Sequence, residues 1–315
     1  MDRLFKSTLE VLNITFPIFA IVAIGYFMRR KKILDEKATE ALNKLAYNLG
    51  LPSLIFISII SNKLEDIFNL KVIEAIYSTV VLFTGMSMLV FVFVKTDRRT
   101  RGAMIVSSFR CNMAFIGFPI ILSAYGTLAM AKASLVVAFL TPVNVIFSVL
   151  IFRFFSGEKD GSLSKLFLGL ARDPLIIAAV SGIVFSYFNL RIPDSIMSVF
   201  DILSGMAMAI ALISIGASFK FFHVRENMKF LSLVSLLKLM VLPLVGLLLC
   251  IFVFRINKLD RDVVCLLFSM PVAVTTFIMG VEHNSDYDFI SSSLIFSTIV
   301  SAFTISMWLL VLKLF

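Results

Sequence analysis

Two prolines lie deep inside apolar stretches of the sequence, with polar residues close to each. Pro119 follows Asn112 and Gly117 in one stretch, and Pro271 precedes Thr275 in another. Proline lacks an N–H, and its ring clashes with the carbonyl one turn back, so it opens a helix. Backbone groups freed in a bilayer survive only where protein or a water-filled cavity covers them. Two helices broken at corresponding places therefore indicate a midplane binding site, whereas the simpler interpretation is that each proline only kinks its helix.

Two amide side chains lie deep in the same apolar sequence. Asn112 precedes the first proline motif, and Asn144 lies beside Pro142 in the next stretch. An amide offers two donors and one acceptor oxygen without a charge. This chemistry suits a carboxylate that must bind and then leave. The alternative is that both amides only hydrogen-bond neighbouring helices.

Three ionisable residues are candidates for a charge or proton role. Lys238 lies nine residues into an apolar run, where a charge costs about 2.5–3.5 kcal/mol. It either serves an anion or proton, or pairs with a carboxylate or a backbone carbonyl. Arg110 either contacts an anion directly or extends its side chain toward an interface. Glu74, near the start of its stretch, is a candidate proton carrier.

The sequence lacks the motifs of an enzyme. His223 and His283 form no HExxH pattern, and neither a GxSxG elbow nor a phosphate-binding GxxxxGK[ST] loop occurs. The three cysteines form no CxxC pair. Lys and Arg occur in short groups between apolar runs, which does not resemble a nucleic-acid-binding face. We therefore expect no enzymatic activity, cofactor, metal or nucleic-acid partner.

The composition requires that these residues be positioned by membrane helices. The chain has 315 residues, 59% hydrophobic and 16% charged, whereas soluble domains have about 45–50% and about 25%. One bilayer span needs about 20 apolar residues. Apolar runs predict ten spans, at 11–28, 38–60, 72–94, 102–124, 127–152, 173–190, 195–219, 229–254, 262–282 and 288–314.

The polar interruption after residue 153 divides the predicted spans five and five. The boundaries predict one five-helix repeat over 1–156, a cytoplasmic linker over 157–172 and a second repeat over 173–315. With an odd number of spans in each half, related halves form an inverted repeat, a frequent construction in transporters. Loops after the odd-numbered spans carry more Lys and Arg than the others in total, which predicts that both termini lie outside. The fold class is thus all-α and polytopic, with broken crossover helices at spans four and nine.

Several motifs resemble those of the auxin efflux carrier family, which includes plant PIN proteins and bacterial malate and malonate permease-like members. The fourth span carries Asn112-x4-Gly117-x-Pro119 followed by Tyr125-Gly126. The remaining similarities follow in order along the chain: Leu51–Phe56, Arg172–Pro174, Ser204–Met208, Ser214–Ala217, Met270–Pro271 and Asp286. Their order and spacing cover nearly the whole chain.

The resemblance implies a crossing of spans four and nine at Pro119 and Pro271, beside the substrate. Asn112 would hold a substrate carboxylate, and Asn144 stands where plant members carry a glutamine. Candidate contacts also include Gly117 and the residues after the second break: Val272, Ala273 and Thr275. Spans one, two, six and seven would form a scaffold, often dimeric, and spans three to five and eight to ten would form the transport domain.

Two departures narrow the implied substrate. Ile55 stands where plant carriers place a serine three residues after the second-span proline, and the middle loop is short. Both favour a small metabolic carboxylate, malate- or malonate-like, over auxin. The sequence therefore predicts a plasma-membrane carrier of small organic anions that works by alternating access as a homodimer. The alternatives are a membrane-embedded ligand sensor and a sodium-coupled bile-acid-type carrier.

Overall fold

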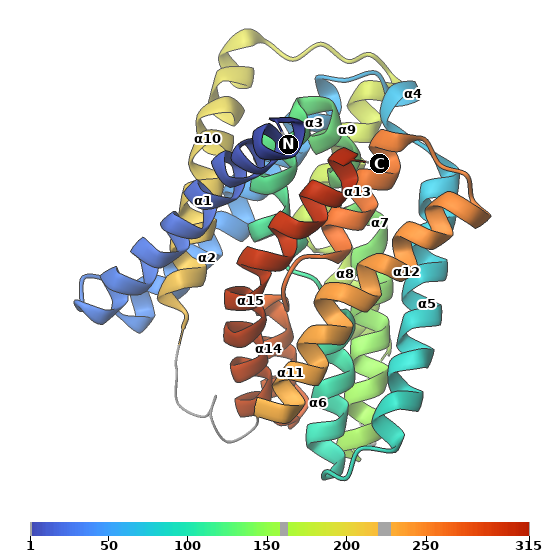
Figure 1. Ribbon diagram of the computed structural model, residues 1–315. Helices are drawn as coiled ribbons and strands as arrows, with labels where there is room; N and C mark the ends of the chain where they lie inside the picture. Colours follow the sequence, from blue (N-terminus) through green and yellow to red (C-terminus); the bar gives the residue numbers. More distant parts are fainter. Residues whose placement is uncertain (1, 158–162, 220–227, 315) are drawn as a thin grey trace. The chain divides into compact units, whose positions relative to one another are not determined.

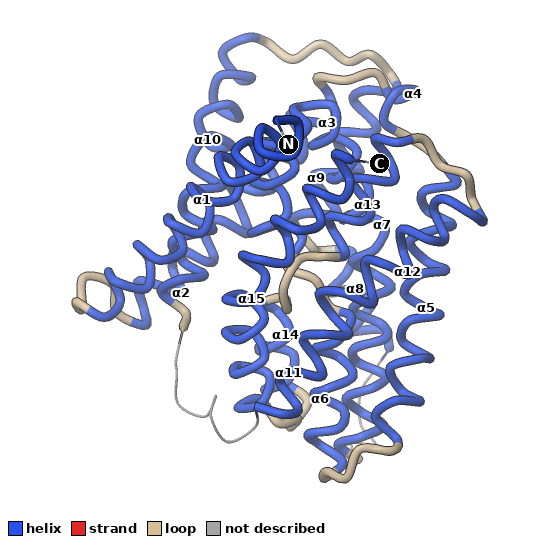
Figure 2. Tube along the Cα trace, viewed as in Figure 1, coloured by secondary structure: helices blue, strands red, loops and turns tan. Residues whose placement is uncertain are grey.

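The computed structural model describes residues 2–157, 163–219 and 228–314 (Figures 1 and 2). Within these ranges the chain is helical and forms no strand beyond one isolated antiparallel bridge between Cys111 and Val272. The chain divides into two compact units. Unit 1 comprises residues 1–70, 114–139 and 167–219, and unit 2 comprises residues 71–113, 140–166 and 220–315.

The helices of unit 1 come from both halves of the sequence. They are α1 (Asp2–Arg30), α2 (Glu36–Leu45), the π-helical segment η1 (Ala46–Gly50), α3 (Leu51–Ile60), α4 (Leu64–Ile67), α9 (Pro174–Tyr187) and α10 (Asp194–Ala217). The first part of α7 (Phe118–Ser156) also belongs here. The π-helical segment η2 (Met113–Gly117) and α8 (Leu163–Ala171) each cross a boundary between the units.

Unit 2 contains the end of α7 and most of the C-terminal half. Its other elements are α5 (Leu70–Val92, from Lys71 on), α6 (Arg98–Phe109), α11 (Met228–Leu236), η3 (Leu237–Val241), α12 (Leu242–Leu248), η4 (Leu249–Val253), α13 (Lys258–Phe268), α14 (Val274–Glu282) and α15 (Tyr287–Leu314). The predicted repeats and linker stay predictions, and residues 158–162 of that linker lie outside the described ranges.

Among the described residues, seven helical segments are long and apolar enough to cross a membrane, and α9 is a shorter apolar helix. These helices confirm an α-helical, multi-pass membrane protein, whereas the count of ten spans stays a prediction. The predicted fourth and ninth spans are interrupted, so neither forms one long helix. The predicted fifth span is joined to the end of the fourth in the segment Met113–Ser156. Gly126 lies inside that segment with φ 78° and ψ −167°, so two helices meet there at a kink.

In unit 1, α1 and α10 pack with their backbones in close approach. A Cβ added to Gly25 would fall on the carbonyl of Ile213, and one added to Gly216 would fall on the carbonyl of Val22. Each helix thus presents a glycine to the backbone of the other. Lipid tails are as apolar as the side chains, so helix association in membranes depends on such close packing of small residues.

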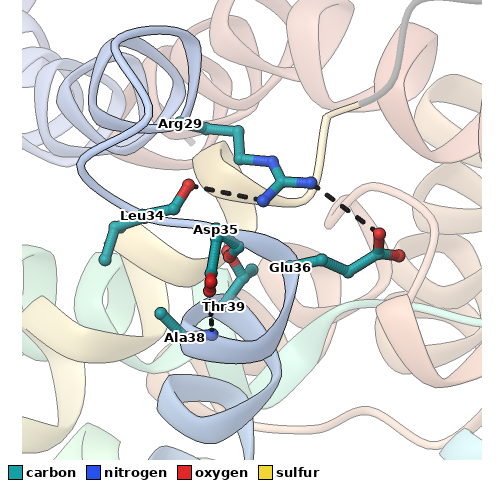
Figure 3. A network of polar contacts seen from close by, with 6 residues as sticks. All are labelled: Arg29, Leu34, Asp35, Glu36, Ala38 and Thr39. Carbon is teal, nitrogen blue, oxygen red and sulfur yellow. Dashed lines mark hydrogen bonds and ion pairs between the residues drawn. The ribbon is translucent and has the colours of Figure 1, made fainter.

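A polar network fixes the turn from α1 into α2 (Figure 3). Arg29 donates to the carbonyl of Leu34 at 3.3 Å, and its guanidinium lies 3.9 Å from the carboxylate of Glu36. Asp35 caps α2 by accepting from the Ala38 N–H at 2.7 Å. A capped N-terminus satisfies one of the otherwise unbonded N–H groups of a helix. Arg29, at the end of the first predicted span, is therefore held at the start of the second.

Of the four π-helical segments in the described residues, three end two residues before a proline. The prolines are Pro52, Pro119 and Pro243, after η1, η2 and η3 respectively. Because proline has no N–H, it cannot bond the carbonyl four residues earlier. For Pro243, the carbonyl four residues earlier is that of Leu239, and it accepts a hydrogen bond from the indole N–H of Trp308 at 2.8 Å. A tertiary partner thus replaces the hydrogen bond that the proline removes.

Candidate functional site

Two interrupted helices of unit 2 meet through extended backbone. α6 ends at Phe109, and α13 ends at Phe268, before α14 begins at Val274. The N–H of Asn112 donates to the carbonyl of Pro271 at 2.8 Å, and the N–H of Ala273 donates to the carbonyl of Arg110 at 3.2 Å. These two bonds flank the bridge between Cys111 and Val272. Backbone groups that lose helical partners at the two breaks thus bond each other, as an apolar setting requires.

The crossing at Pro119 and Pro271 that the resemblance implies stays a prediction. In unit 2, the paired residues are Cys111 and Val272. Pro271 lies in the extended stretch before α14, whereas Pro119 lies in the first turn of α7 and belongs, with Gly117, to unit 1. The helix ahead of the first motif ends at Phe109, so the extended residues precede Pro119 in the chain.

Arg110 is buried beside this contact, with 8% of its surface exposed. Its guanidinium donates to the Thr275 hydroxyl at 2.7 Å, to the Met279 sulfur at 3.0 Å and to the Ser148 hydroxyl at 3.3 Å. Ser148 in turn donates to the carbonyl of Asn144 at 2.6 Å. These neutral groups orient the planar guanidinium, whose fixed donors match the geometry of a carboxylate. The structure thus brings together three predicted residues, Arg110, Thr275 and Asn144.

The two amides are buried and incompletely bonded. Asn112 is 4% exposed and Asn144 is 8% exposed. Among the described residues, neither the Nδ2 donor of Asn112 nor the Oδ1 acceptor of Asn144 has a hydrogen-bond partner. A buried polar group without a partner costs about 1–3 kcal/mol. The unpartnered donor of Asn112 is thus a position where an acceptor atom gains a hydrogen bond.

Lys238 is fully buried and lies on η3. Its Nζ lies 2.7 Å from the Cys111 sulfur and 3.2 Å from the carbonyl oxygen of Phe268. Of the alternatives that the sequence leaves open for this lysine, the structure shows a backbone carbonyl as its partner. Glu74, near the start of α5, is exposed. Its role and those of the other candidate residues stay predictions.

Sequence reasoning missed four residues of this region: Cys111, Ser148, Met279 and Ser297. Ser297 accepts from the N–H of Val272 at 3.1 Å. Cys111 follows Arg110 directly, so its place beside a candidate residue is the only signal the sequence gives for it. Ser148 lies four residues after Asn144, a spacing that puts both on one helical face. No group of three or more His, Cys, Asp or Glu side chains within the described ranges could hold a metal ion.

Comparison with known proteins identifies the family. Residues 11–309 match the family described as membrane transport protein. A transporter of Methanothermobacter thermautotrophicus, named as uncharacterized, is 26% identical over 94% of this chain and 96% of its own length. A Rhizobium meliloti protein, provisionally named malonate transporter, is 20% identical over 94% of each chain.

A third relative carries a different kind of name. The lysosomal cholesterol signaling protein of Mus musculus is 23% identical over 98% of this chain but only 38% of its own length. The family match nonetheless spans nearly the whole chain, and the resemblance drawn from its motifs agrees with it. This chain therefore belongs to the membrane transport protein family, which confirms its likeness to the auxin efflux carriers.

Proposed function

We propose that this chain is a secondary transporter of small organic anions, mono- or dicarboxylates, and that it works by alternating access. The observation that carries the proposal is the buried Nδ2 donor of Asn112 without a partner among the described residues, two positions from the buried guanidinium of Arg110. A carboxylate is an acceptor with two oxygens, and both residues offer donors. The name of the Rhizobium meliloti relative supports a small dicarboxylate such as malonate.

The physical argument concerns what replaces water around the carboxylate. Hydrogen bonds between ionised partners are roughly twice as strong as neutral ones. Electrostatic interactions also strengthen where the surroundings are apolar. Arg110 is held by Thr275, Ser148 and Met279, so little reorganisation is needed when an anion arrives. The uncharged amide of Asn112 adds a bond without a second full charge, which allows release.

The other parts of the proposal follow from the sequence. The distribution of Lys and Arg between loops supports a carrier with both termini outside the plasma membrane. The family resemblance supports a homodimer in which one group of helices moves against a fixed scaffold. The extended backbone between α6 and α14 supports alternating access, since broken helices at the substrate site recur in such carriers.

Substitution of Asn112 tests the site. Asn112→Ala removes a donor to a charged group, worth about 1.5–3 kcal/mol, so affinity for the substrate falls roughly 10- to 150-fold at 1.4 kcal/mol per decade. Asn112→Leu lowers affinity further because it also fills the space. The measurement is titration calorimetry on purified protein with malonate and a panel of small mono- and dicarboxylates. Asn48→Ala is the matched control, since that exposed amide only bonds the carbonyl of Lys44.

The results separate this function from its alternatives. An unchanged dissociation constant for the bound acid in Asn112→Ala would refute the site. A second candidate, a ligand sensor, is favoured by the name of the mouse relative. It would bind the acid and yet give no flux of labelled acid into proteoliposomes. Flux that requires sodium would favour the sodium-coupled carrier.

A further inference from the structure

The extended stretch after α6 has two sides that contact different parts of unit 2. Successive side chains of extended backbone point to opposite faces, so Cys111 points away from Arg110 and Asn112. The contacts agree with this geometry. Arg110 contacts residues of α7 and α14, whereas Cys111 contacts Lys238 on η3 and the carbonyl of Phe268 on α13. Lys238 therefore lies on the side opposite the proposed carboxylate site.

On this second side, Lys238 lies at the end of an interrupted helix. Phe268 is the last residue of α13, and its carbonyl lies 3.2 Å from Lys238 Nζ. The last carbonyls of a helix lack helical partners and carry a partial negative charge. A cation placed there satisfies the carbonyl and the helix dipole together. Within the described part of the chain, Lys238 forms no ion pair, so a backbone oxygen and a sulfur are its polar partners.

The sequence shows why the lysine reaches this place. Pro243 cannot bond the carbonyl of Leu239, and the chain widens into η3 just before it. Lys238 is the second residue of that widened turn. The side chain is fully buried, although a lysine in a span normally extends its charge to the interface. The widened turn and the end of α13 thus hold the Nζ of Lys238 where bulk water does not reach it.

We propose that Lys238 is a built-in cation at the helix break, where its charge offsets the partial negative charge at the end of α13 and leaves no need for a sodium ion. Lys238 is a positioning residue, because it holds Cys111 and the end of α13 in place. It thereby fixes the backbone pairing of Cys111 with Val272, which positions Arg110 and Asn112 on either side. The proposal also implies that transport needs no sodium ion at this break, and this part rests on the proposed function. The stabilising effect of the Lys238 charge does not rest on it, because the charge stabilises the break whether or not an anion binds.

Chemical rescue tests this proposal without using a substrate. Lys238→Ala removes three methylenes and the ammonium, which n-propylammonium reproduces. The measurement is the thermal unfolding midpoint of purified protein in choline chloride, with n-propylammonium chloride, sodium chloride or 1-propanol added at equal concentration. Lys238→Ala should unfold at a lower temperature than wild type, and n-propylammonium should restore part of that loss whereas 1-propanol should not. Lys258→Ala is the matched control, because that exposed lysine also bonds a backbone carbonyl, that of Leu312.

A second variant and a measurement on the wild-type protein keep the proposal testable. Lys238→Met lacks the charge and is only one heavy atom shorter than lysine. It should unfold at a lower temperature than wild type and show no rescue, because most of the space is filled. A Lys238→Met protein as stable as wild type would overturn the proposal. So would a specific rise of the wild-type midpoint in sodium chloride over choline chloride. If Lys238→Ala does not fold, these two measurements still decide. If the wild-type protein binds no carboxylate while n-propylammonium still rescues Lys238→Ala, the proposed function is refuted and the proposal for Lys238 is not.

Discussion

Gly216 offers a severe test of the packing in unit 1. A Cβ on this residue would lie 2.8 Å from the backbone nitrogen of Tyr26 and from the carbonyl carbon of Val22, and closer still to the Val22 oxygen. Ordinary contacts of a Cβ begin near 3.4 Å. All of these neighbours are backbone atoms of α1, so no side-chain rotation relieves the clash. Gly216→Ala therefore forces α1 and α10 apart.

The size of the effect on the free energy of unfolding follows from contributions of opposite sign. Inserting a methyl group into a packed interior costs about 1–3 kcal/mol. Replacing glycine by alanine within a helix returns roughly 1 kcal/mol. Separation of the helices also weakens the dispersion contacts along the rest of their interface. The first two contributions leave a loss of about 0–2 kcal/mol, and the weakened dispersion contacts add to it, so we expect Gly216→Ala to lower the free energy of unfolding.

Gly205 on the same helix is the matched control, since a Cβ there meets nothing within 4 Å. Gly205→Ala should be neutral or stabilising by up to about 1 kcal/mol. The assay is thermal unfolding in detergent followed with a thiol-reactive dye, because all three cysteines are free and buried and react only as the protein opens. Equal midpoints for the two variants would refute the close approach of α1 and α10.

Two further predictions concern unit 2. Trp308→Phe keeps an aromatic ring but removes the indole N–H that donates to the carbonyl of Leu239. Circular dichroism should therefore show a loss of about 1–3 kcal/mol in unfolding free energy; unchanged stability would mean that another group bonds that carbonyl. Partial burial raises the pKa of Asp97, but the hydrogen bonds from the side chain and backbone N–H of Thr100 outweigh it and hold the pKa below its ordinary value. A lowered folded-state pKa stabilises the fold above the ordinary value of about 3.9 and loses that contribution as the pH falls through the folded-state pKa. Asp97→Asn should therefore unfold more easily than wild type at neutral pH, and thermal scans between about pH 3 and pH 7 should show the difference shrinking at the acid end; a constant difference would contradict the assignment.

The parts of this fold that depend on composition and local spacing could be predicted from the sequence. Long apolar runs predict membrane helices because a bilayer span has a fixed length. The predicted boundary near Gly126 coincides with a residue whose backbone leaves the helix. Pro271 lies in the break between α13 and α14, as expected of a residue that acts on the backbone of its own segment, whereas the break after Phe109 lies ahead of Pro119. These inferences need no knowledge of which helices are neighbours.

The parts that depend on tertiary neighbours could not be predicted. Nothing in the spacing indicates that Arg110 contacts Thr275, or that Lys238 contacts Cys111. The residues of each pair are far apart in the chain and come together only on folding. The need for glycine in α1 and α10 likewise depends on the backbone of the opposite helix, which the sequence does not identify. The π-helical segments fall between these cases, since a proline marks where the helical hydrogen bonds fail but not whether the turn before it widens.

The prolines also show why a broken helix alone is a weak sign of a binding site. The carbonyl freed by Pro243 is bonded by the Trp308 indole, so that break is closed within the protein. At the break around Pro271, the backbone is bonded by Asn112, Ser297 and Lys238. Among the buried side-chain atoms without a hydrogen-bond partner in the described residues is the Nδ2 donor of Asn112 at this break. An apolar interior makes such a donor costly, and under the proposed function a bound carboxylate would supply the acceptor that removes this cost. The remaining donor, more than the proline, is therefore the reason to place an anion at this break.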